Sequence, residues 1–327
     1  MFAPAAASAS STHVNVEFAQ AVADGLTRNG QKTLPPSWLY DEVGSALFEV
    51  ITVLPEYGVT RAEAALLRSS AGEIVRACRS PRLIIELGSG TGSKTRHILS
   101  AAARYGPVDY LPIDISPAAQ DTCVNALSGM NNVCIEPVEA SYIEGIELAL
   151  AHRKPDQSAL ILFLGSTIGN FNRGEAAAFL RQISKRTQPG DYLLLGADLV
   201  KPRMTLLRAY DDPIGVTAAF NLNLLARINR ELDGRFEIRQ FAHEARWNER
   251  QSRIEMHLRS SIAQDVRVGA LDTSIHFDAG ETIWTESSHK FRAEEIPGIG
   301  CRTGWPCVRQ WIDREWGFAE TLFQKPV

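Results

Sequence analysis

A regular alternation of apolar and helical segments between residues 60 and 198 constrains this chain more than any other feature. The runs Leu83–Leu87, Ala159–Leu164 and Tyr192–Gly196 are predominantly apolar. Two further strand-like runs end at Asp114 and surround Val133–Val138, and helical segments separate the runs. Strands that are apolar along their length are buried on both faces, which is typical of parallel sheets. The order therefore predicts an α/β fold, with a parallel sheet covered by helices on both sides.

Two helices of this region have predictable starts. Thr60 and Glu63 have the spacing of a capping box, in which each side chain satisfies a backbone N–H of the first turn. Asn172 and Glu175 stand at the start of another helix, after the most apolar run. We expect both helices to begin at these residues.

The pattern changes after Asp198. Residues 203–233 form a long, interrupted helical region, and the segments 236–247, 252–261 and 265–277 then alternate apolar and polar residues. Such alternation is typical of antiparallel strands with one buried face. The sequence therefore predicts a sheet domain at 61–198 and 288–327, an α+β domain at 13–60 and 199–287, and a disordered Ala/Ser-rich tail at 1–12.

The composition excludes several classes of protein. The 327 residues carry a formal charge of −4 and 45% are hydrophobic, which is typical of a globular chain without the basic surface of a nucleic-acid binder. No apolar run approaches the roughly 18–20 residues that span a bilayer. The five cysteines form no CxxC pair, which argues against a disulfide scaffold and a zinc site. We therefore expect a cytoplasmic enzyme with reduced thiols, no metal, no nucleic-acid partner and no membrane association.

A glycine-rich turn after the first strand is the main chemical feature. The stretch E-L-G-S-G-T-G, from Glu86 to Gly92, connects that strand to the following helix. Glycines allow positive φ angles and a close approach of the backbone to a ligand, and the start of the helix offers N–H groups. Because such folds bind ligands at the carboxyl ends of their strands, we expect a cofactor at this turn.

Four interpretations of the turn remain open. A P-loop requires its second glycine at position 93, and a dinucleotide-binding turn requires its third glycine there. The chain has Ser93 at that position, so neither motif is complete. The turn E-L-G-x-G-x-G of class I methyltransferases, which bind S-adenosylmethionine, matches in full. A tight turn without a ligand is the fourth interpretation. Asp114, at the end of the next strand, suits both ribose hydroxyls of a nucleotide, but it would suit NAD equally.

Seven further segments carry a more specific resemblance. They are LPPSWLYD at 34–41, LPEY at 54–57, FLGSTIGN at 163–170, DLVK at 198–201, RAYDD at 208–212, RIEM at 253–256 and TESSHKF at 285–291. Together they resemble the histidine Nα-methyltransferases of ergothioneine biosynthesis, which form the betaine hercynine, from about residue 30 to 292. The resemblance implies that the sheet domain is a class I S-adenosylmethionine methyltransferase domain and the α+β domain a substrate-binding domain.

The resemblance also implies the residues that contact S-adenosylmethionine. They are Gly88 and Gly90 at the methionine part, Lys94 at its carboxylate, Asp114 at the ribose, and Ser141 and Tyr142 where the family has an Asp-Phe pair at the adenine. Ser141 accepts a hydrogen bond without carrying a charge, so we expect this departure to weaken or displace cofactor binding.

For the substrate, the resemblance implies seven contact residues. They are Asn170 and Tyr210 at the amine and carboxylate, Tyr57, Glu286 and Ser288 at the imidazole, Met256 against the ring, and Tyr40 near the active site. We place Asn170 at the end of a buried strand, beside Gly165 and Gly169, where it offers both a donor and an acceptor. Glu286 and Ser288 are two residues apart, so they face the same side of an extended strand. Ordinary structural roles stay open as alternatives: a turn for Asn170, core packing for Tyr210 and Met256, and a solvated strand position for Glu286.

The expected chemistry needs no acid–base residue. Methyl transfer from a sulfonium to a neutral amine depends on geometry and desolvation. The resemblance implies three successive methylations of the α-amine of L-histidine by a monomer that binds only small molecules. The alternatives are another amino acid or an aromatic amine as substrate, a nucleotide-dependent enzyme that uses the near-miss turn, or a binding module without turnover.

Overall fold

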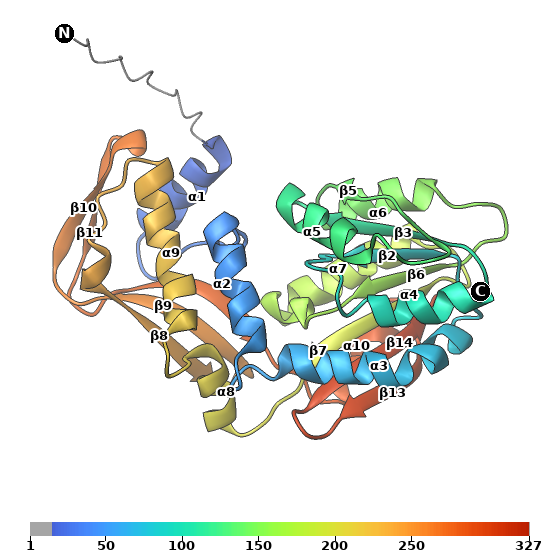
Figure 1. Cartoon of the computed structure of the whole chain (residues 1–327). Coiled ribbons are helices and arrows are strands. Elements are labelled where there is room, and N and C mark those ends of the chain that lie inside the picture. Colours follow the sequence, from blue (N-terminus) through green and yellow to red (C-terminus); the bar gives the residue numbers. More distant parts are fainter. Residues whose placement is uncertain (1–14, 327) are drawn as a thin grey trace, which may run out of the picture. The chain divides into compact units, whose positions relative to one another are not determined.

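The computed structural model describes residues 15–326, so the predicted tail at 1–12 lies outside the described residues. The chain divides into two compact units (Figure 1). The first, here called the sheet unit, contains residues 49–210, 247–254 and the chain from Ser287 onward. The second, here called the insert unit, contains the chain up to Phe48 and residues 211–246 and 255–286.

The sheet unit is built on one large sheet. Its strands are β2 (Leu83–Leu87), β3 (Val108–Asp114), β4 (Val133–Ile135), β5 (Val138–Glu139), β6 (Ala159–Phe163), β7 (Tyr192–Asp198), β13 (Cys307–Asp313) and β14 (Phe318–Gln324). The order is β13-β14-β7-β6-β2-β3-β4, with β5 also paired to β3. The strands from β7 to β4 are parallel, whereas β13 and β14 are antiparallel additions at the β7 edge. The predicted α/β fold with a parallel sheet is therefore confirmed, and the antiparallel hairpin is a feature that the prediction did not include.

Helices cover both faces of this sheet (Figure 1). They are α3 (Val59–Ala77), α4 (Arg96–Ala102), α5 (Pro117–Leu127), α6 (Tyr142–Ala151), α7 (Arg173–Arg186) and α10 (Glu295–Arg302), with α8 (Arg203–Tyr210) and the short turns η2 (Ala103–Tyr105) and η3 (Thr167–Asn170). Side chains of α6, α7 and α10 form one apolar core with alternate residues of the strands. Helices α3 and α4 pack on each other, and α5 packs on β3.

The two predicted helix starts had different outcomes. Asn172 and Glu175 form the capping box of α7, as expected. The capping box at Thr60 was wrong: α3 begins at Val59, after Gly58, without a side-chain cap. Glu63 is instead completely buried and accepts a hydrogen bond from the backbone N–H of Gly165 at 2.5 Å. The carboxylate of Glu63 therefore binds a backbone group about a hundred residues away, and it does not cap the helix as the local spacing predicted.

The insert unit combines two small sheets with helices. Its elements are α1 (Val16–Leu26), β1 (Lys32–Thr33), η1 (Pro36–Leu39), α2 (Glu42–Val53), α9 (Val216–Glu231), η4 (Ile238–Gln240), β8 (Phe241–Asn248), β9 (Arg253–Ser260), β10 (Gln264–Val268), η5 (Gly269–Leu271), β11 (Thr273–Phe277) and β12 (Thr282–His289). Four strands follow the order β1-β12-β9-β8, and β10 pairs antiparallel with β11. Four elements contain residues of both units: helix α2 and strands β8, β9 and β12.

The predicted pattern after Asp198 is largely recovered. The interrupted helical region is α8 followed by α9, and the interruption contains Asp212, which accepts hydrogen bonds from the N–H groups of Val216 and Thr217 at the start of α9. The segment 265–277 contains two strands joined by the turn η5, rather than a single one. Residues 49–60, 199–210, 247–254 and Ser287 lie in the sheet unit, although the sequence placed them in the α+β domain. The roles of the two units as methyltransferase and substrate-binding domains stay predictions.

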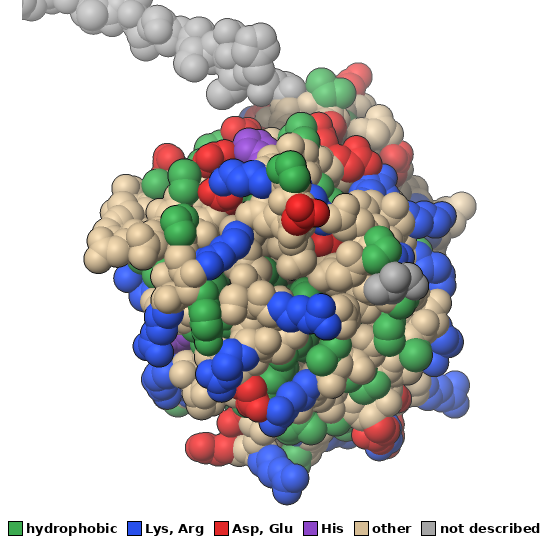
Figure 2. Space-filling view, turned by 90° about the vertical axis from the view of Figure 1, so that its right-hand side faces the viewer, with side chains coloured by type: hydrophobic (Ala, Val, Ile, Leu, Met, Phe, Trp, Pro, Cys, Tyr) green, Lys and Arg blue, Asp and Glu red, His purple; other side chains and the backbone are tan. Residues whose placement is uncertain are grey.

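One face of the sheet unit carries the C-terminal end of the chain (Figure 2). Lys and Arg side chains are spread over this face among polar and hydrophobic ones. Gln324 at the end of β14 pairs with Tyr192 at the start of β7, so this face lies at the amino ends of the parallel strands. The expected cofactor residues follow the opposite, carboxyl ends. Within residues 15–326, no helix has both the length and the apolar character needed to cross a bilayer.

Candidate active site

The glycine turn after β2 has the backbone that its sequence predicts. Gly88, Gly90 and Gly92 have φ angles of 71°, 50° and 65°, which side chains with a Cβ rarely adopt. A Cβ on Gly92 would lie 2.7 Å from Cys123 Sγ, whereas a Cβ on Gly90 would meet nothing within 4 Å. Gly92 is therefore required by packing, and Gly90 leaves an open approach to the backbone.

Glu86 fixes this turn from inside the fold. Its carboxylate is buried and accepts hydrogen bonds from Thr95 Oγ1, at 2.7 and 2.8 Å, and from the Tyr110 hydroxyl. Burial raises the pKa of Glu86 to about 7, although both hydrogen bonds oppose the shift. The acid that precedes the glycines therefore ties β2 to β3 and to the start of α4.

Asp114 is drawn toward the same turn. It ends β3, and its carboxylate accepts a hydrogen bond from the N–H of Ser116 at 3.0 Å. Burial raises the pKa of Asp114, while backbone hydrogen bonds from Ser116 and Gly90 act against that increase. The carboxylate thus stands beside Gly90, where a ribose bound at the turn would meet it.

Tyr142 and Ser141 lie at the start of α6. A Cβ on Gly88 would lie 3.0 Å from the Tyr142 hydroxyl, so the aromatic ring flanks the turn. The ring also packs edge-on against Phe163, with centroids 5.8 Å apart, and burial raises the pKa of Tyr142 to about 12. Ser141 is the exposed N-cap residue of α6, and its side chain makes no capping hydrogen bond.

Lys94 belongs to a buried group that we call the acidic cluster: Glu63, Glu86, Glu320 and Lys94. Its ammonium is ion-paired with Glu63, and 22% of the Lys94 side chain is exposed. Glu320 is buried on β14, where burial and the neighbouring Glu63 raise its pKa well above the ordinary range. Sequence reasoning missed Glu63 and Glu320. The acid at position 320, inside the apolar run of β14, was the available signal.

Asn170 does not end a strand, which corrects the sequence-based description. Strand β6 ends at Phe163, because Gly165 and Ser166 both adopt left-handed backbone conformations, with φ angles of 73° and 58°. Asn170 is the last residue of the η3 turn that follows. Its half-buried side chain makes no hydrogen bond to the described part of the chain. The amide therefore keeps its donor and acceptor for another group.

Tyr57, Tyr210 and Ser288, three predicted substrate residues, are brought together in the sheet unit. The Tyr210 hydroxyl, at the end of α8, donates to Ser288 Oγ at 2.8 Å. The rings of Tyr57 and Tyr210 meet edge-on, with centroids 6.1 Å apart. Segments about 80 and 150 residues apart in the sequence thus form one small group of aromatic rings and hydroxyls.

A second buried polar group, here called the cationic cluster, adjoins these hydroxyls. It consists of Lys290, Lys201 and Asp198. Lys290 Nζ hydrogen-bonds to Tyr210 Oη at 2.8 Å and to Ser288 Oγ at 2.9 Å. Sequence reasoning assigned these three residues no role, although all of them lie within the DLVK and TESSHKF segments.

The remaining predicted residues lie in the insert unit. Tyr40 packs against Phe48 and Phe220, with centroids 5.5 Å away in each case. Met256 is buried on β9, and Glu286 is half-buried on β12. Ser288 lies on the same strand as Glu286, so the expected extended conformation is confirmed.

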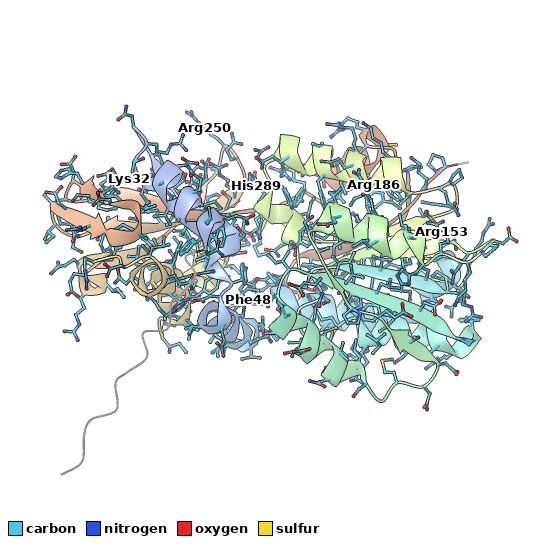
Figure 3. The ribbon with its side chains drawn as sticks, turned by 90° about the horizontal axis from the view of Figure 1, so that it is seen from above. Lys32, Phe48, Arg153, Arg186, Arg250 and His289 are labelled. Carbon is cyan, nitrogen blue, oxygen red and sulfur yellow. The ribbon has the colours of Figure 1, made fainter. Side chains whose placement is uncertain are left out.

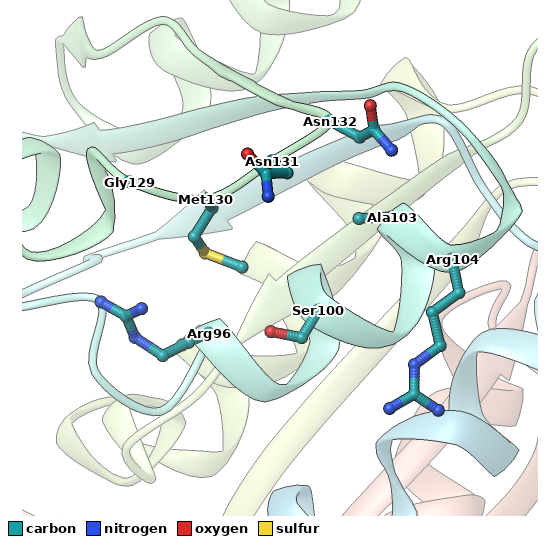
Figure 4. A pocket seen from close by; sticks show the side chains of 8 residues that line it. All are labelled: Arg96, Ser100, Ala103, Arg104, Gly129, Met130, Asn131 and Asn132. Carbon is teal, nitrogen blue, oxygen red and sulfur yellow. The ribbon is translucent and has the colours of Figure 1, made fainter.

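A surface cleft lies away from these residues. It has a volume of about 380 Å³ and is lined by α4 and by the turn before β4 (Figure 4). Arg96, Ser100 and Arg104 contribute from the α4 side, and Met130 contributes from the other. Because Asn132 in its lining immediately precedes β4, the cleft extends to the amino ends of the strands.

Within residues 15–326, no three His, Cys, Asp or Glu side chains gather as a metal site would require.

The fold and the turn define the class of this protein. A class I S-adenosylmethionine-dependent methyltransferase has this parallel sheet, with a glycine turn after its first strand. The chain belongs to the family of histidine-specific, SAM-dependent methyltransferases, whose model matches residues 18–325. The match extends beyond the segments that carried the resemblance and includes the C-terminal hairpin.

Two curated relatives support this assignment. The chain is 46% identical over 297 residues to the histidine N-alpha-methyltransferase of Mycobacterium tuberculosis, covering 90% of this chain and 91% of that protein. It is 43% identical to the enzyme of the same name from Mycolicibacterium smegmatis, covering 91% and 92%. Among solved structures, magnesium protoporphyrin IX methyltransferase from Synechocystis PCC 6803 has 12% identity, a TM-score of 0.43 and coverage of 89% and 97%.

Proposed function

We propose that this protein transfers methyl groups from S-adenosylmethionine to the α-amine of L-histidine, three times, to give hercynine. The observation that carries the proposal is the match to histidine N-alpha-methyltransferases along nearly the whole length of both chains. The grouping of Tyr57, Tyr210 and Ser288 in the fold supports it independently. We further propose that the enzyme works as a cytoplasmic monomer.

The residues around the glycine turn fit the cofactor. The open side of Gly90 admits a close approach, and the neighbouring Asp114 carboxylate would accept hydrogen bonds from ribose hydroxyls. Lys94 has three N–H donors, so pairing with Glu63 leaves capacity for the cofactor carboxylate. Gly88 with Tyr142 would line the site, and Ser141 would reach the adenine. The bound cofactor supplies a methyl group that is already activated on sulfur.

The substrate roles follow from donor and acceptor chemistry. Asn170 would grip the amine and the carboxylate. Tyr210, expected at the carboxylate, would lie beside it while its hydroxyl donates to Ser288. Glu286 would accept the imidazole N–H, and Ser288 or Tyr57 would serve the other ring nitrogen. Met256 and Tyr40 would pack near the ring.

In this scheme the side chains position the substrate rather than exchange protons with it. The amine must be neutral when it attacks, and loss of its proton to water before transfer meets that need. The enzyme then contributes alignment and exclusion of water. We therefore assign no general acid or base.

Initial rates with a panel of amines test the substrate assignment. We expect kcat/KM for L-histidine to exceed that for L-tryptophan, L-phenylalanine and histamine by about a hundredfold or more, because a site built for polar groups discriminates strongly against analogues that lack them. An equal or higher value for another amino acid or aromatic amine would replace the proposal with the alternative substrate.

A pair of acid variants sharpens this test. Glu286→Gln should lower kcat/KM for histidine by about tenfold or more, since a charge-assisted hydrogen bond to the ring is lost. Glu281→Gln is the matched control, because Glu281 lies in the same unit and is ion-paired with Lys32. Equal effects of the two variants would contradict the role of Glu286.

A further inference from the structure

A completely buried lysine stands behind the two predicted substrate hydroxyls. The Lys290 side chain has 0% exposure, and its ammonium has three polar neighbours. Nζ lies 2.8 Å from Tyr210 Oη, 2.9 Å from Ser288 Oγ and 2.8 Å from Asp198 Oδ2. An ammonium has three N–H donors and no acceptor. Lys290 therefore donates hydrogen bonds to the two hydroxyls and is ion-paired with Asp198, and it offers no acceptor to any neighbour.

The directions of these hydrogen bonds restrict Ser288. Its Oγ accepts from Tyr210 and from Lys290, and a hydroxyl oxygen has two lone pairs. Both are occupied, so the remaining capacity of Ser288 is its own O–H donor. Neither neighbour can accept that proton, because Lys290 is an ammonium and Tyr210 already donates toward Ser288.

The Ser288 proton has no acceptor within the described residues, although the residue is only 5% exposed. A buried donor without an acceptor costs free energy. The arrangement is thus incomplete in one specific way: it lacks a hydrogen-bond acceptor next to Ser288 that a ligand can supply.

Asp198 and Lys201 hold Lys290 in this position. Asp198 Oδ1 is paired with Lys201 and accepts from Trp316 Nε1 at 3.1 Å, while Oδ2 faces Lys290. Burial alone would raise the pKa of Asp198, but the two ammoniums keep it below its usual range. Lys201 also lies over the Trp316 ring, 4.2 Å from its centroid. The lysine is therefore anchored from the side opposite the hydroxyls.

We propose that Lys290 is a positioning residue that fixes Ser288 as a hydrogen-bond donor to an acceptor atom of the bound substrate. The acceptor is an unprotonated ring nitrogen or a carboxylate oxygen. If the acceptor is the ring nitrogen, the arrangement selects the neutral imidazole, because a protonated ring has no acceptor nitrogen and would face an excess of buried positive charge. This inference rests on the proposed function, because it takes histidine as the substrate.

Steady-state kinetics of Lys290→Met, Ser288→Ala and the double variant test the proposal. We expect Lys290→Met to raise KM for histidine by about ten- to a hundredfold and KM for S-adenosylmethionine by less than about threefold. Ser288→Ala should raise KM for histidine similarly. In the Lys290→Met background, however, Ser288→Ala should add less than about threefold, because Ser288 is then no longer fixed. Lys290→Arg, which keeps the charge and the donors, should recover part of the loss.

Arg153→Met is the matched control. Arg153 is partly buried, with 13% of its side chain exposed, and is paired with a buried carboxylate, Asp191. It lies at the other end of the sheet unit from His289, the neighbour of Lys290 (Figure 3). Arg153→Met should also lower the stability of the protein. We expect Arg153→Met to leave KM for histidine unchanged. If Lys290→Met and Arg153→Met raise that KM equally, or if the effects of Lys290→Met and Ser288→Ala are independent, the proposal is overturned.

Binding calorimetry identifies the acceptor and covers a failure to fold. If the acceptor is the ring nitrogen, Ser288→Ala weakens binding of both histidine and histamine, whereas a carboxylate acceptor restricts the loss to histidine. Should Lys290→Met not fold, an unchanged histidine affinity in Ser288→Ala would alone overturn the inference. Absence of histidine methylation by the wild-type enzyme would instead count against the proposed function.

Discussion

The sheet unit contains two buried polar clusters of opposite charge. The acidic cluster has three carboxylates, Glu63, Glu86 and Glu320, against the single ammonium of Lys94. The cationic cluster has two ammoniums, Lys201 and Lys290, against the single carboxylate of Asp198.

The two clusters relieve their excess charge differently. Burial raises the pKa values of Glu86 and Glu320, so the acidic cluster takes up protons. In the cationic cluster, Asp198 stays ionised and burial lowers the pKa of Lys201 to about 8. Lys290 uses two of its donors on Tyr210 and Ser288. The first cluster thus supports the glycine turn and holds Lys94 beside it. The second cluster holds the hydroxyls of Tyr210 and Ser288, which we propose face the substrate.

The largest expected effect comes from removing the shared anion of the cationic cluster. Asp198→Asn leaves two buried ammoniums without a carboxylate, so the free energy of unfolding should fall by about 3–5 kcal/mol. Urea denaturation measures this. Asp109→Asn, whose partner Lys154 is largely exposed, should cost less than about 1 kcal/mol. If the two variants lose the same free energy of unfolding, Asp198 contributes no more to stability than an exposed ion pair does.

The pH dependence of stability should separate the clusters. The pKa of Glu86 is raised from 4.5 to about 7, so its stabilising contribution is complete below 4.5 and is lost as pH rises to about 7. The loss amounts to about 3 kcal/mol at most. The pKa of Asp198 is lowered, so its contribution to stability is present at neutral pH. That contribution is lost only in acid, as the pH falls below the usual pKa of an aspartate. Denaturation of wild type and Glu86→Gln between pH 5 and 8 checks this, since the variant should show a flatter profile; parallel profiles would contradict it.

Within the acidic cluster, two isosteric changes should differ. Glu63→Gln removes the partner of Lys94 and should cost about 2 kcal/mol, a value reduced because Lys94 is partly exposed. Burial and the neighbouring Glu63 raise the pKa of Glu320 well above its usual range, which favours its neutral form, so Glu320→Gln should cost less than about 1 kcal/mol. Thermal unfolding of both variants measures the difference. A larger loss for Glu320→Gln would show that Glu320 carries the charge.

The smallest expected effect concerns Ser141. An aspartate at this exposed N-cap position would add a charged acceptor for an adenine amino group, so the affinity for S-adenosylhomocysteine should rise about threefold. Calorimetry of Ser141→Asp measures it, with Ser128→Asp as an exposed control. An unchanged affinity would remove the proposed contact with the adenine.

The sequence predicted those features that depend on local pattern. Continuous apolar runs marked the parallel strands, and the positive φ angles of Gly88, Gly90 and Gly92 agree with the interpretation of the turn. The start of α7 at Asn172 and Glu175 was also local and was confirmed, and the structure shows that these residues form a capping box. Such features are decided within a few residues, so no tertiary information was needed.

Tertiary contacts decided the features that were wrong or missed. Glu63 was assigned to a helix start, but it pairs with Gly165, about a hundred residues away. Asn170 was placed at a strand end, because the left-handed turn at Gly165 and Ser166 was not recognised. Lys290 approaches Tyr210 from 80 residues further along the chain, so no spacing in the sequence could reveal that contact.

The mass spectrum of products from L-histidine and S-adenosylmethionine tests the central claim most directly. We expect histidine species that carry one, two and then three added methyl groups over time, all on the α-nitrogen. The trimethylated species should be the end product. A time course in which S-adenosylmethionine is bound but histidine is recovered unmodified, or is methylated on the ring, would contradict it.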